Sequence, residues 1–259
     1  MSATARALFI AFLAGAAVLA ANAQTSSGYL ADGAFDVMTV LPPAPSAGDP
    51  RYNADRLIFL ATRKLVGTPR YALATSDVQG GAVNLMKDFS CATGLTLTPQ
   101  TAPRTAALIQ RASRDTASQS NRAKDIFKRQ RPFLIDQGEV CEDKVSLARS
   151  YDYPSGHTTA GWTWALILSE LIPARSSDIL ARGRAYGESR FICGAHNESA
   201  VEAGRLSATA TMAAVRGTAA YQADVMAAKA EIATLLADPA TPKPTACAVE
   251  HDLIMQKVL

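Results

Sequence analysis

Apolar residues recur at the three- to four-residue spacing of helices along most of this chain, whereas runs of alternating β-branched residues are few. The pattern predicts a first helix over residues 53–66, which Gly67 and Pro69 end. The other predicted helical segments are residues 71–90, 105–130 and 155–173, a segment that Ser176 caps and that continues through Tyr186, and residues 196–228. We therefore predict an all-α fold.

Two of these segments differ in character. The segment over residues 155–173 contains both tryptophans of the chain and is apolar on most faces, so we expect it at the centre of the fold. The segment over residues 105–130 is rich in Ala, Arg, Gln and Lys, and it stops before Pro132 because proline disfavours a helical residue ahead of it. Between them, residues 133–153 are expected to form a loop that frames a cleft.

The N-terminal residues have the composition of a secretory signal. Arg6 supplies a positive charge, residues 7–20 are apolar, and Ala21-Asn22-Ala23 has the form of a cleavage site. The alternative, a membrane anchor, is disfavoured because the apolar run is short of the ~20 residues of a span. The predicted organisation is a signal peptide over 1–23, an extended segment over 24–50, a helical domain over 51–236 and a tail over 237–259.

Charge and cysteine content narrow the function further. The net charge of +3 is small, and no basic stripe with interleaved aromatic residues is present, so a nucleic-acid partner is not expected. Export would place the four cysteines in an oxidising compartment, where disulfides form. Their pairing stays open among three arrangements, and buried free thiols are the alternative. With three histidines and no C-x-x-C, no metal site is expected.

Three short motifs carry the candidate chemistry: Lys124-x6-Arg131-Pro132, Pro154-Ser155-Gly156-His157, and Ser189-Arg190-x5-His196. On a continuous helix, Lys124 and Arg131 would project from one face. An arginine holds two oxygens of a phosphate, whereas a lysine acts as a point charge. The alternative is a solvated cationic face, because Lys128 and Arg129 lie nearby without a role in any motif.

The second motif is more specific. Gly156 lets the backbone approach a ligand, and a helix that starts there points free amides and its positive dipole end at an anion. The Ser155 hydroxyl can donate as well. A helix cap with an incidental His157 is the alternative. A serine hydrolase is disfavoured because Ser155 lacks the G-x-S-x-G elbow and does not face His157 on a helix.

Together these groups meet the needs of phosphoryl transfer. Three cations and the helix amides can stabilise the equatorial oxygens, and His157 and His196 can serve the attacking and leaving positions. The third histidine, His251, lies in the tail and is expected to be solvated.

In this order, the motifs resemble the signature of the type-2 phosphatidate phosphatase and vanadium haloperoxidase superfamily. The flanking sequence over residues 41–216 resembles its class A bacterial non-specific acid phosphatases. The resemblance implies an all-helical bundle, export to the periplasm, and cofactor-free hydrolysis of phosphate monoesters, with inhibition by phosphate or vanadate. It also implies homo-oligomers and no membrane association after signal cleavage.

By position, the resemblance implies that His196 is the nucleophile that forms a phosphohistidine and that His157 is the general acid. The implied phosphate ligands are Lys124, Arg131, Ser155, Gly156 and Arg190. A His157 that must be protonated predicts that kcat/KM falls as pH rises through about 6 to 7.

The chain departs from the signature at three positions. Ala200 stands where the signature has Asp, Asn197 where it has Trp, and Asp152 where it has Ser. If residues 196 and 200 share a helix, an Asp at 200 would orient His196, and alanine cannot. We therefore expect a weakened enzyme whose turnover rises in Ala200→Asp.

Two alternatives remain at this level: a phosphate- or vanadate-binding relative with little catalysis, and a vanadate-dependent haloperoxidase. A membrane lipid phosphatase is disfavoured because spanning segments are missing. Leaving-group preference is expected to depend on the residues at the entrance, which we expect to be Tyr151, Asp152, Tyr153 and Asn197.

Overall fold

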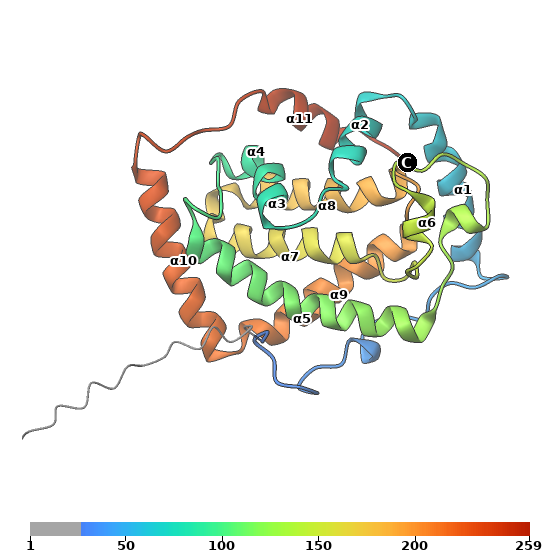
Figure 1. The fold of residues 1–259 in the computed structure, drawn as a ribbon, viewed down its shortest axis with the longest axis horizontal. Coiled ribbons are helices and arrows are strands. Elements are labelled where there is room, and N and C mark those ends of the chain that lie inside the picture. The colour runs from blue at the N-terminus through green and yellow to red at the C-terminus, as the bar shows by residue number, and fades with distance from the viewer. Residues whose placement is uncertain (1–26) are drawn as a thin grey trace, which may run out of the picture.

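The computed structural model describes residues 27–259, so the predicted signal segment lies outside the described residues. Within 27–259 the chain forms eleven α-helices and short 3-10 turns, with no strand (Figure 1). This confirms the all-α prediction. None of the described helices combines the length and the apolar character needed to span a membrane.

The centre of the bundle is α7 (Gly156–Leu171), which packs against α5 (Pro103–Phe127), α8 (Ser176–Ile192) and α9 (Glu198–Arg216). Figure 1 shows α7 lying between α5 and α8. Ile167 is fully buried. The prediction of a central, largely apolar helix is therefore confirmed for this segment, because it is covered on several faces.

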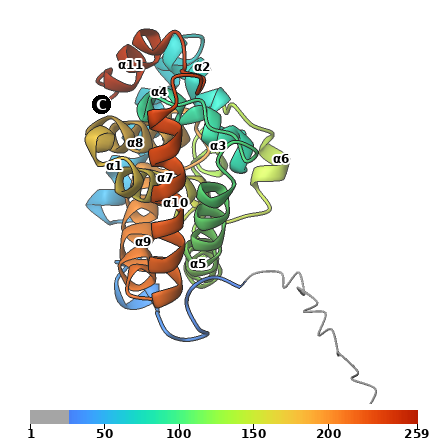
Figure 2. The ribbon, with the colours of Figure 1, turned by 90° about the vertical axis from the view of Figure 1, so that its left-hand side faces the viewer.

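The remaining helices surround this core. Figure 2 shows α10 (Ala219–Ala237) running across one end of the bundle. On the other side, α1 (Pro50–Thr62) and α2 (Pro69–Ser76) pack against α8. The short described helices are α3 (Ala82–Asp88), α4 (Ser90–Thr93), α6 (Lys144–Leu147) and α11 (Cys247–Met255).

Several predicted helix boundaries are wrong for local reasons. The first helix starts at Pro50, because Asp49 caps it by accepting from the Arg51 amide. Ser176 is the first residue of α8 and not its cap, since its hydroxyl donates to the carbonyl groups of Ser169 in α7 and of Pro173 in the preceding turn. The predicted tail is irregular only as far as α11.

The long helix α5 ends at Phe127, three residues before the predicted end. Lys128 has a left-handed backbone with φ of 49°, and this residue stops the helix. Arg131 is extended because Pro132 follows it. The prediction that Lys124 and Arg131 project from one face of a continuous helix is therefore wrong. Arg131 reaches the same region from a separate segment.

The predicted segment over residues 196–228 is also divided. Asn197 is the N-cap residue of α9, which begins at Glu198, so His196 precedes the helix. A turn then separates α9 from α10, and Thr218 caps α10 by accepting from the Tyr221 amide. Residues 196 and 200 consequently do not stand one turn apart on a helix.

All four cysteines lie in disulfides, Cys91–Cys247 and Cys141–Cys193. The first joins α11 to α4, and the second joins the loop before α6 to the turn after α8. This excludes the free-thiol alternative and selects one of the three pairings.

The two disulfides should differ in their effect on the free energy of unfolding. Cys91 and Cys247 are 156 residues apart and the other pair 52, and a cross-link restricts the unfolded chain more when its loop is longer. We expect Cys91→Ser/Cys247→Ser to lower the free energy of unfolding by up to about 5 kcal/mol. The Cys141→Ser/Cys193→Ser variant should lose roughly 1 kcal/mol less. Denaturant titrations of both variants measure this, and the reverse order would contradict it.

Candidate active site

Arg190 lies in the last turn of α8, and its side chain is fully buried. Its Nη2 donates to the carboxylate of Glu142, but its Nε and Nη1 have no hydrogen-bond partner within residues 27–259. Buried guanidinium N–H groups without acceptors are energetically costly. The two unpaired nitrogens therefore mark a place where an anion would bind.

Arg131 is held beside this place by the main chain. Its Nε donates to the Ser150 carbonyl at 2.8 Å, and its Nη1 donates to the Ala195 carbonyl at 2.8 Å. The same Nη1 lies 3.0 Å from Nε2 of His196. Burial lowers the pKa of Arg131, with a further contribution from the charge of Arg190. The backbone thus fixes one cation directly against an imidazole.

Lys124, in the last turn of α5, supplies the third cation. Its side chain is buried, and Nζ donates to the Tyr151 carbonyl at 2.6 Å. A Cβ on Gly156 would lie 3.8 Å from the Lys124 Cε, so the lysine passes the start of α7. Burial, reinforced by the charge of Arg131, lowers the pKa of Lys124 to about 7. A bound anion would restore its positive charge.

The start of α7 faces this cluster and is fixed by α9. Ser155 is the N-cap residue, and its Oγ accepts from the Thr158 amide and hydroxyl. Its own amide donates to the Ala200 carbonyl at 2.9 Å. A Cβ on Gly204 would lie 2.8 Å from the Ser155 carbonyl, so a glycine is needed for this close approach. The prediction that α7 begins at Ser155-Gly156 is confirmed.

His157 follows in the first turn of α7. Its Nε2 lies 3.1 Å from the Val78 carbonyl. The positive charge of Arg190, together with burial, lowers the pKa of His157 to about 3. The free site therefore holds a neutral imidazole whose Nε2–H donates to Val78. The expectation that His157 titrates between about 6 and 7 is wrong for the free site.

His196 is buried and points both ring nitrogens at defined partners. Its Nδ1 lies 2.8 Å from the Asp152 carbonyl and 3.0 Å from Asp152 Oδ1. Both are acceptors, so Nδ1 carries the hydrogen and Nε2 presents a lone pair to Arg131. Burial and the nearby charge of Arg131 hold the pKa of His196 well below its usual range. The ring is neutral, and its Nε2 is an unprotonated, nucleophilic nitrogen that faces Arg131.

The expectation that His196 lacks a carboxylate partner is therefore wrong. It treated residue 200 as the one source of that carboxylate, but His196 precedes α9 and a residue outside that helix contacts its ring. Ala200 is instead fully buried in an apolar cluster with Tyr153 and Ala203. The carboxylate that contacts His196 belongs to Asp152, which is 44 residues away in the sequence. No local spacing signals such a contact.

Arg129 belongs to none of the three sequence motifs but has a structural role at the site. This residue is buried, and its Nη2 donates to Asp55 Oδ2 at 2.7 Å. Its Nη1 donates to Ser199 Oγ at 2.6 Å and lies 3.5 Å from Asp152 Oδ2. Nothing in the sequence distinguishes Arg129 from the neighbouring Lys128. Only the tertiary structure shows that it neutralises two buried carboxylates.

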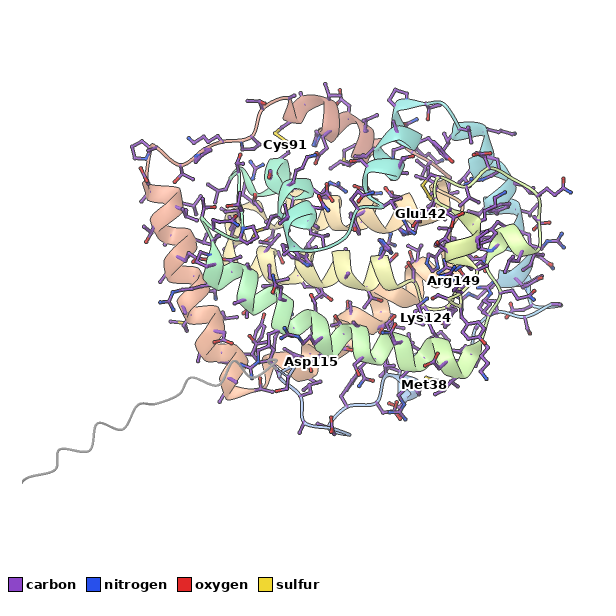
Figure 3. All side chains as sticks on the ribbon, in the orientation of Figure 1. Met38, Cys91, Asp115, Lys124, Glu142 and Arg149 are labelled. Carbon is purple, nitrogen blue, oxygen red and sulfur yellow. A yellow bond between two sulfur atoms is a disulfide. The ribbon has the colours of Figure 1, made fainter. Side chains whose placement is uncertain are left out.

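The loop over residues 133–153 frames the entrance, as predicted. Figure 3 shows Glu142 and Arg149 on this side of the molecule, near Lys124. The Cys141–Cys193 disulfide anchors the loop next to Arg190. The residues that line the pocket here are Val78, Arg131, Cys141, Glu142, Asp143, Ser146, Leu147 and Ser150.

Three of the residues predicted at the entrance are buried instead. Asp152 and Tyr153 have no exposed surface, and Asn197 is 3% exposed. Only Tyr151, at 40%, is accessible. The prediction that all four line the entrance is therefore wrong, because Tyr153 packs against Ala200 and Ala203 of α9 and Asp152 bonds to Asn197.

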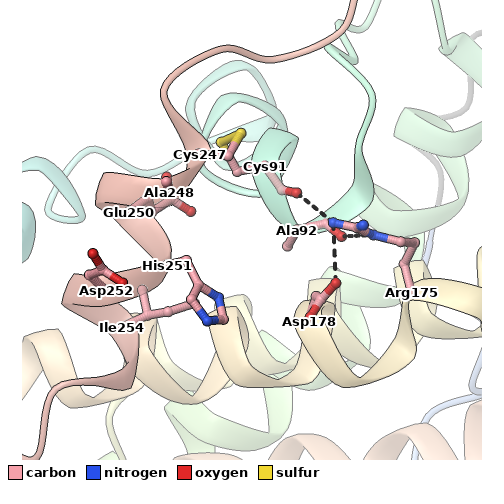
Figure 4. Close-up of a pocket in the computed structure, with 10 residues that line it drawn as sticks. All are labelled: Cys91, Ala92, Arg175, Asp178, Cys247, Ala248, Glu250, His251, Asp252 and Ile254. Carbon is pink, nitrogen blue, oxygen red and sulfur yellow. Dashed lines mark hydrogen bonds and ion pairs between the residues drawn. A yellow bond between two sulfur atoms is a disulfide. The ribbon is translucent and has the colours of Figure 1, made fainter.

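Another pocket lies under α11 and is separate from this cluster. Figure 4 shows His251 and Asp178 on opposite sides of it, near the Cys91–Cys247 disulfide. His251 is exposed, as expected. In residues 27–259, no group of three or more His, Cys, Asp or Glu is placed to hold a metal ion.

Known proteins with similar sequences give this geometry a context. Residues 106–223 match the PAP2 superfamily. The chain is 39% identical over 218 residues to an acid phosphatase of Zymomonas mobilis, with 83% of each chain covered. It is 35% identical to a non-specific acid phosphatase of Providencia stuartii, covering 78% of this chain and 83% of that one. It is 33% identical to one of Salmonella typhimurium, covering 74% and 78%.

The Glu142 carboxylate accepts a hydrogen bond from Arg190, so it should compete with a bound anion for this guanidinium group. We expect Glu142→Gln to lower the Kd for inorganic phosphate roughly tenfold, equivalent to about 1.4 kcal/mol, because the anion no longer displaces a charged partner. Calorimetric titration at fixed ionic strength measures this. Glu139→Gln, an exposed position on the same loop, is the matched control and should leave Kd unchanged. Equal or weaker binding in Glu142→Gln would contradict the competition.

Proposed function

The chain belongs to the PAP2 superfamily and, within it, to the class A acid phosphatases, which are phosphoric monoester hydrolases; on this premise we propose that it acts through a phosphohistidine on His196. One observation carries the proposal: His196 Nε2 presents its lone pair 3.0 Å from Arg131, beside the unpaired nitrogens of Arg190. A nucleophilic nitrogen thus borders a buried anion site.

In the proposed first step, Lys124, Arg131 and Arg190 bind the phosphoryl oxygens, with the amide of Gly156 and the hydroxyl of Ser155. These fixed donors stabilise the charge that builds on the equatorial oxygens. The His196 Nε2 lone pair forms a bond to phosphorus while the bond from phosphorus to the leaving oxygen breaks. The leaving oxygen takes up a proton.

In the second step, water attacks the phosphohistidine. His157 removes a proton from that water and returns it to the phosphate, the bond between phosphorus and Nε2 breaks, and inorganic phosphate leaves as its monoanion. His196 returns to the neutral ring seen in the free site. Because the product carries the same charges as the substrate phosphoryl group, phosphate should compete with substrate, and vanadate should bind in the same cradle.

The leaving oxygen needs a proton, but the low pKa of His157 leaves this imidazole neutral before substrate binds. The proton must therefore have another source. We propose that it enters with the substrate, as the monoanion of the phosphate ester. A bound phosphate also brings negative charge close to His157, which raises the pKa of the imidazole. The proton can then pass to His157 and on to the leaving oxygen.

We also propose export of the chain, on the signal-like composition of residues 1–23, and a substrate class of small phosphate monoesters. The alternative of a binding relative with little catalysis rested on Ala200. The contact between Asp152 and His196 removes that basis, and with it the expectation of a weakened enzyme. Homo-oligomerisation stays a prediction.

Hydrolysis of p-nitrophenyl phosphate in EDTA tests the proposal. We expect unchanged turnover in EDTA, and in His196→Ala a loss of at least about 10³-fold, because the nucleophile is missing. His251→Ala, the exposed histidine outside the site, is the control. Acid-quenched reactions should contain a phosphorylated wild-type protein and none in His196→Ala. Turnover that survives His196→Ala, or that EDTA removes, would contradict the mechanism.

The pH profile tests the source of the proton. If the substrate brings it, kcat/KM should fall as pH rises through the second pKa of the ester, about 6 for alkyl phosphates. Two esters whose second pKa values differ by about one unit should give falling limbs that differ by the same amount.

If kcat/KM falls near pH 7 for both esters, the fall is due to Lys124, whose pKa is about 7 and which loses its positive charge above that pH. That result would contradict a proton carried by the substrate.

A further inference from the structure

Two of the three positions at which the chain departs from the family signature, Asp152 and Asn197, contact each other, and the amide of the third, Ala200, donates to the Asn197 carbonyl at 3.2 Å. Asp152 Oδ1 accepts from the Asn197 amide at 3.1 Å, and Oδ2 accepts from Asn197 Nδ2 at 2.8 Å. The same Oδ1 lies 3.0 Å from His196 Nδ1. Ala200 completes the group, since its carbonyl accepts from the Ser155 amide and its side chain packs with Tyr153.

We propose that Asp152 is the positioning residue for His196 in this enzyme, and that its carboxylate replaces the one that the signature places at position 200. Asn197 locks that carboxylate, and Ala200 leaves the former carboxylate position apolar. The three departures are then one coupled exchange. This inference rests on the proposed function, in which His196 is the nucleophile.

The contacts of Asp152 are those of an ionised carboxylate. Both oxygens face donors only: the Asn197 amide, the Asn197 side-chain amide and the His196 Nδ1–H. A protonated carboxyl group would need an acceptor for its O–H. Burial raises the pKa of Asp152, but the charge of Arg129 and the hydrogen bonds of Asn197 oppose this shift. The geometry thus favours the charged form.

A second layer of contacts keeps the carboxylate in place. The Asp152 amide donates to the Arg129 carbonyl at 2.9 Å, and the Arg129 guanidinium lies 3.5 Å from Asp152 Oδ2. Arg129 is itself held by Asp55 and by Ser199 on α9. Asp55 in turn accepts from the Ser199 amide at 2.9 Å. Helices α1 and α9 therefore both anchor the residue that orients His196.

The carboxylate has a role that the main chain cannot supply. The Asp152 carbonyl alone would keep the hydrogen on Nδ1. When Nε2 bonds to phosphorus, however, the ring becomes positive in a buried site that already contains Arg131, Lys124 and Arg190. A negative charge on the far side of the ring stabilises that state. Loss of the charge should slow phosphorylation of His196 more than it weakens phosphate binding.

The exchange also explains why position 200 is small and apolar. Ala200 has no exposed surface and belongs to an apolar cluster. A carboxylate there, added while Asp152 remains, would be a second buried negative charge in the turn of α9 that starts at Asn197, the partner of Asp152. Each would disfavour ionisation of the other. We expect one carboxylate at either position and not at both.

Asp152→Asn keeps the shape of the side chain and an acceptor oxygen but removes the charge. In rapid-quench experiments we expect the rate of phosphoenzyme formation to fall between about tenfold and 10⁴-fold. The Kd for phosphate should stay within about threefold, because Asp152 does not touch the ligand. Asp252→Asn, an exposed aspartate of α11 outside the site, is the control and should leave both values unchanged. Normal phosphorylation in Asp152→Asn, or equal losses in phosphorylation and binding, would overturn the inference.

A second set of variants transfers the carboxylate from position 152 to position 200. Asp152→Ser/Ala200→Asp should phosphorylate at least about tenfold faster than Asp152→Ser, since it restores one carboxylate. Ala200→Asp alone should not raise turnover and should lower the melting temperature, because it adds a second buried carboxylate. A double variant no faster than Asp152→Ser would overturn the exchange, and this set of variants decides the matter if Asp152→Asn does not fold.

These experiments distinguish an error in the proposed function from an error in the role of Asp152. If the wild-type protein forms no phosphoenzyme, or forms it equally in His196→Ala, the proposed function is wrong. If the wild type forms it on His196 and Asp152→Asn forms it as fast, the function stands and only the role of Asp152 is wrong.

Discussion

Mutual repulsion among three buried cations is the constraint on which the rest of the site depends. Lys124, Arg131 and Arg190 are each at most 7% exposed, and two nitrogens of Arg190 have no acceptor among the residues that the structure describes. Main-chain carbonyls, the partly exposed Glu142 carboxylate and the buried Asp152 carboxylate offset this charge only in part. Its effect reaches both imidazoles, since Arg190 lowers the pKa of His157 and Arg131 contributes to the low pKa of His196. A bound phosphate relieves the repulsion and sets the protonation of the site.

The bundle brings distant segments to this place with short, specific contacts. Helix α9 approaches the start of α7 closely because Gly204 lies against the Ser155 carbonyl. The Ala200 carbonyl accepts from the Ser155 amide, so α9 fixes the turn that opens α7. The Cys141–Cys193 disulfide holds the entrance loop beside α8. Arg131 is then oriented by carbonyl groups of this loop and of the turn before α9.

The sequence predicts those features of the fold and the site that neighbouring residues determine. The start of α7 was predictable because Ser155 is a good N-cap residue and Gly156 follows it. The end of α5 was not, because it depends on a left-handed Lys128, a residue type without that preference. The motif residues converge as their spacing suggests, although Arg131 does so from an extended segment. The contact of Asp152 with His196 and the burial of Arg129 arise from tertiary packing, which no spacing reveals.

A crystal structure of the complex with vanadate tests the central claim most directly, because vanadate adopts the geometry of a phosphoryl group under attack. We predict vanadium bonded to Nε2 of His196, its oxygens on Lys124, Arg131 and Arg190, and the Glu142 carboxylate displaced from Arg190. Vanadate bound at another place, or held near the three cations with His196 Nε2 left unbonded, would contradict the account.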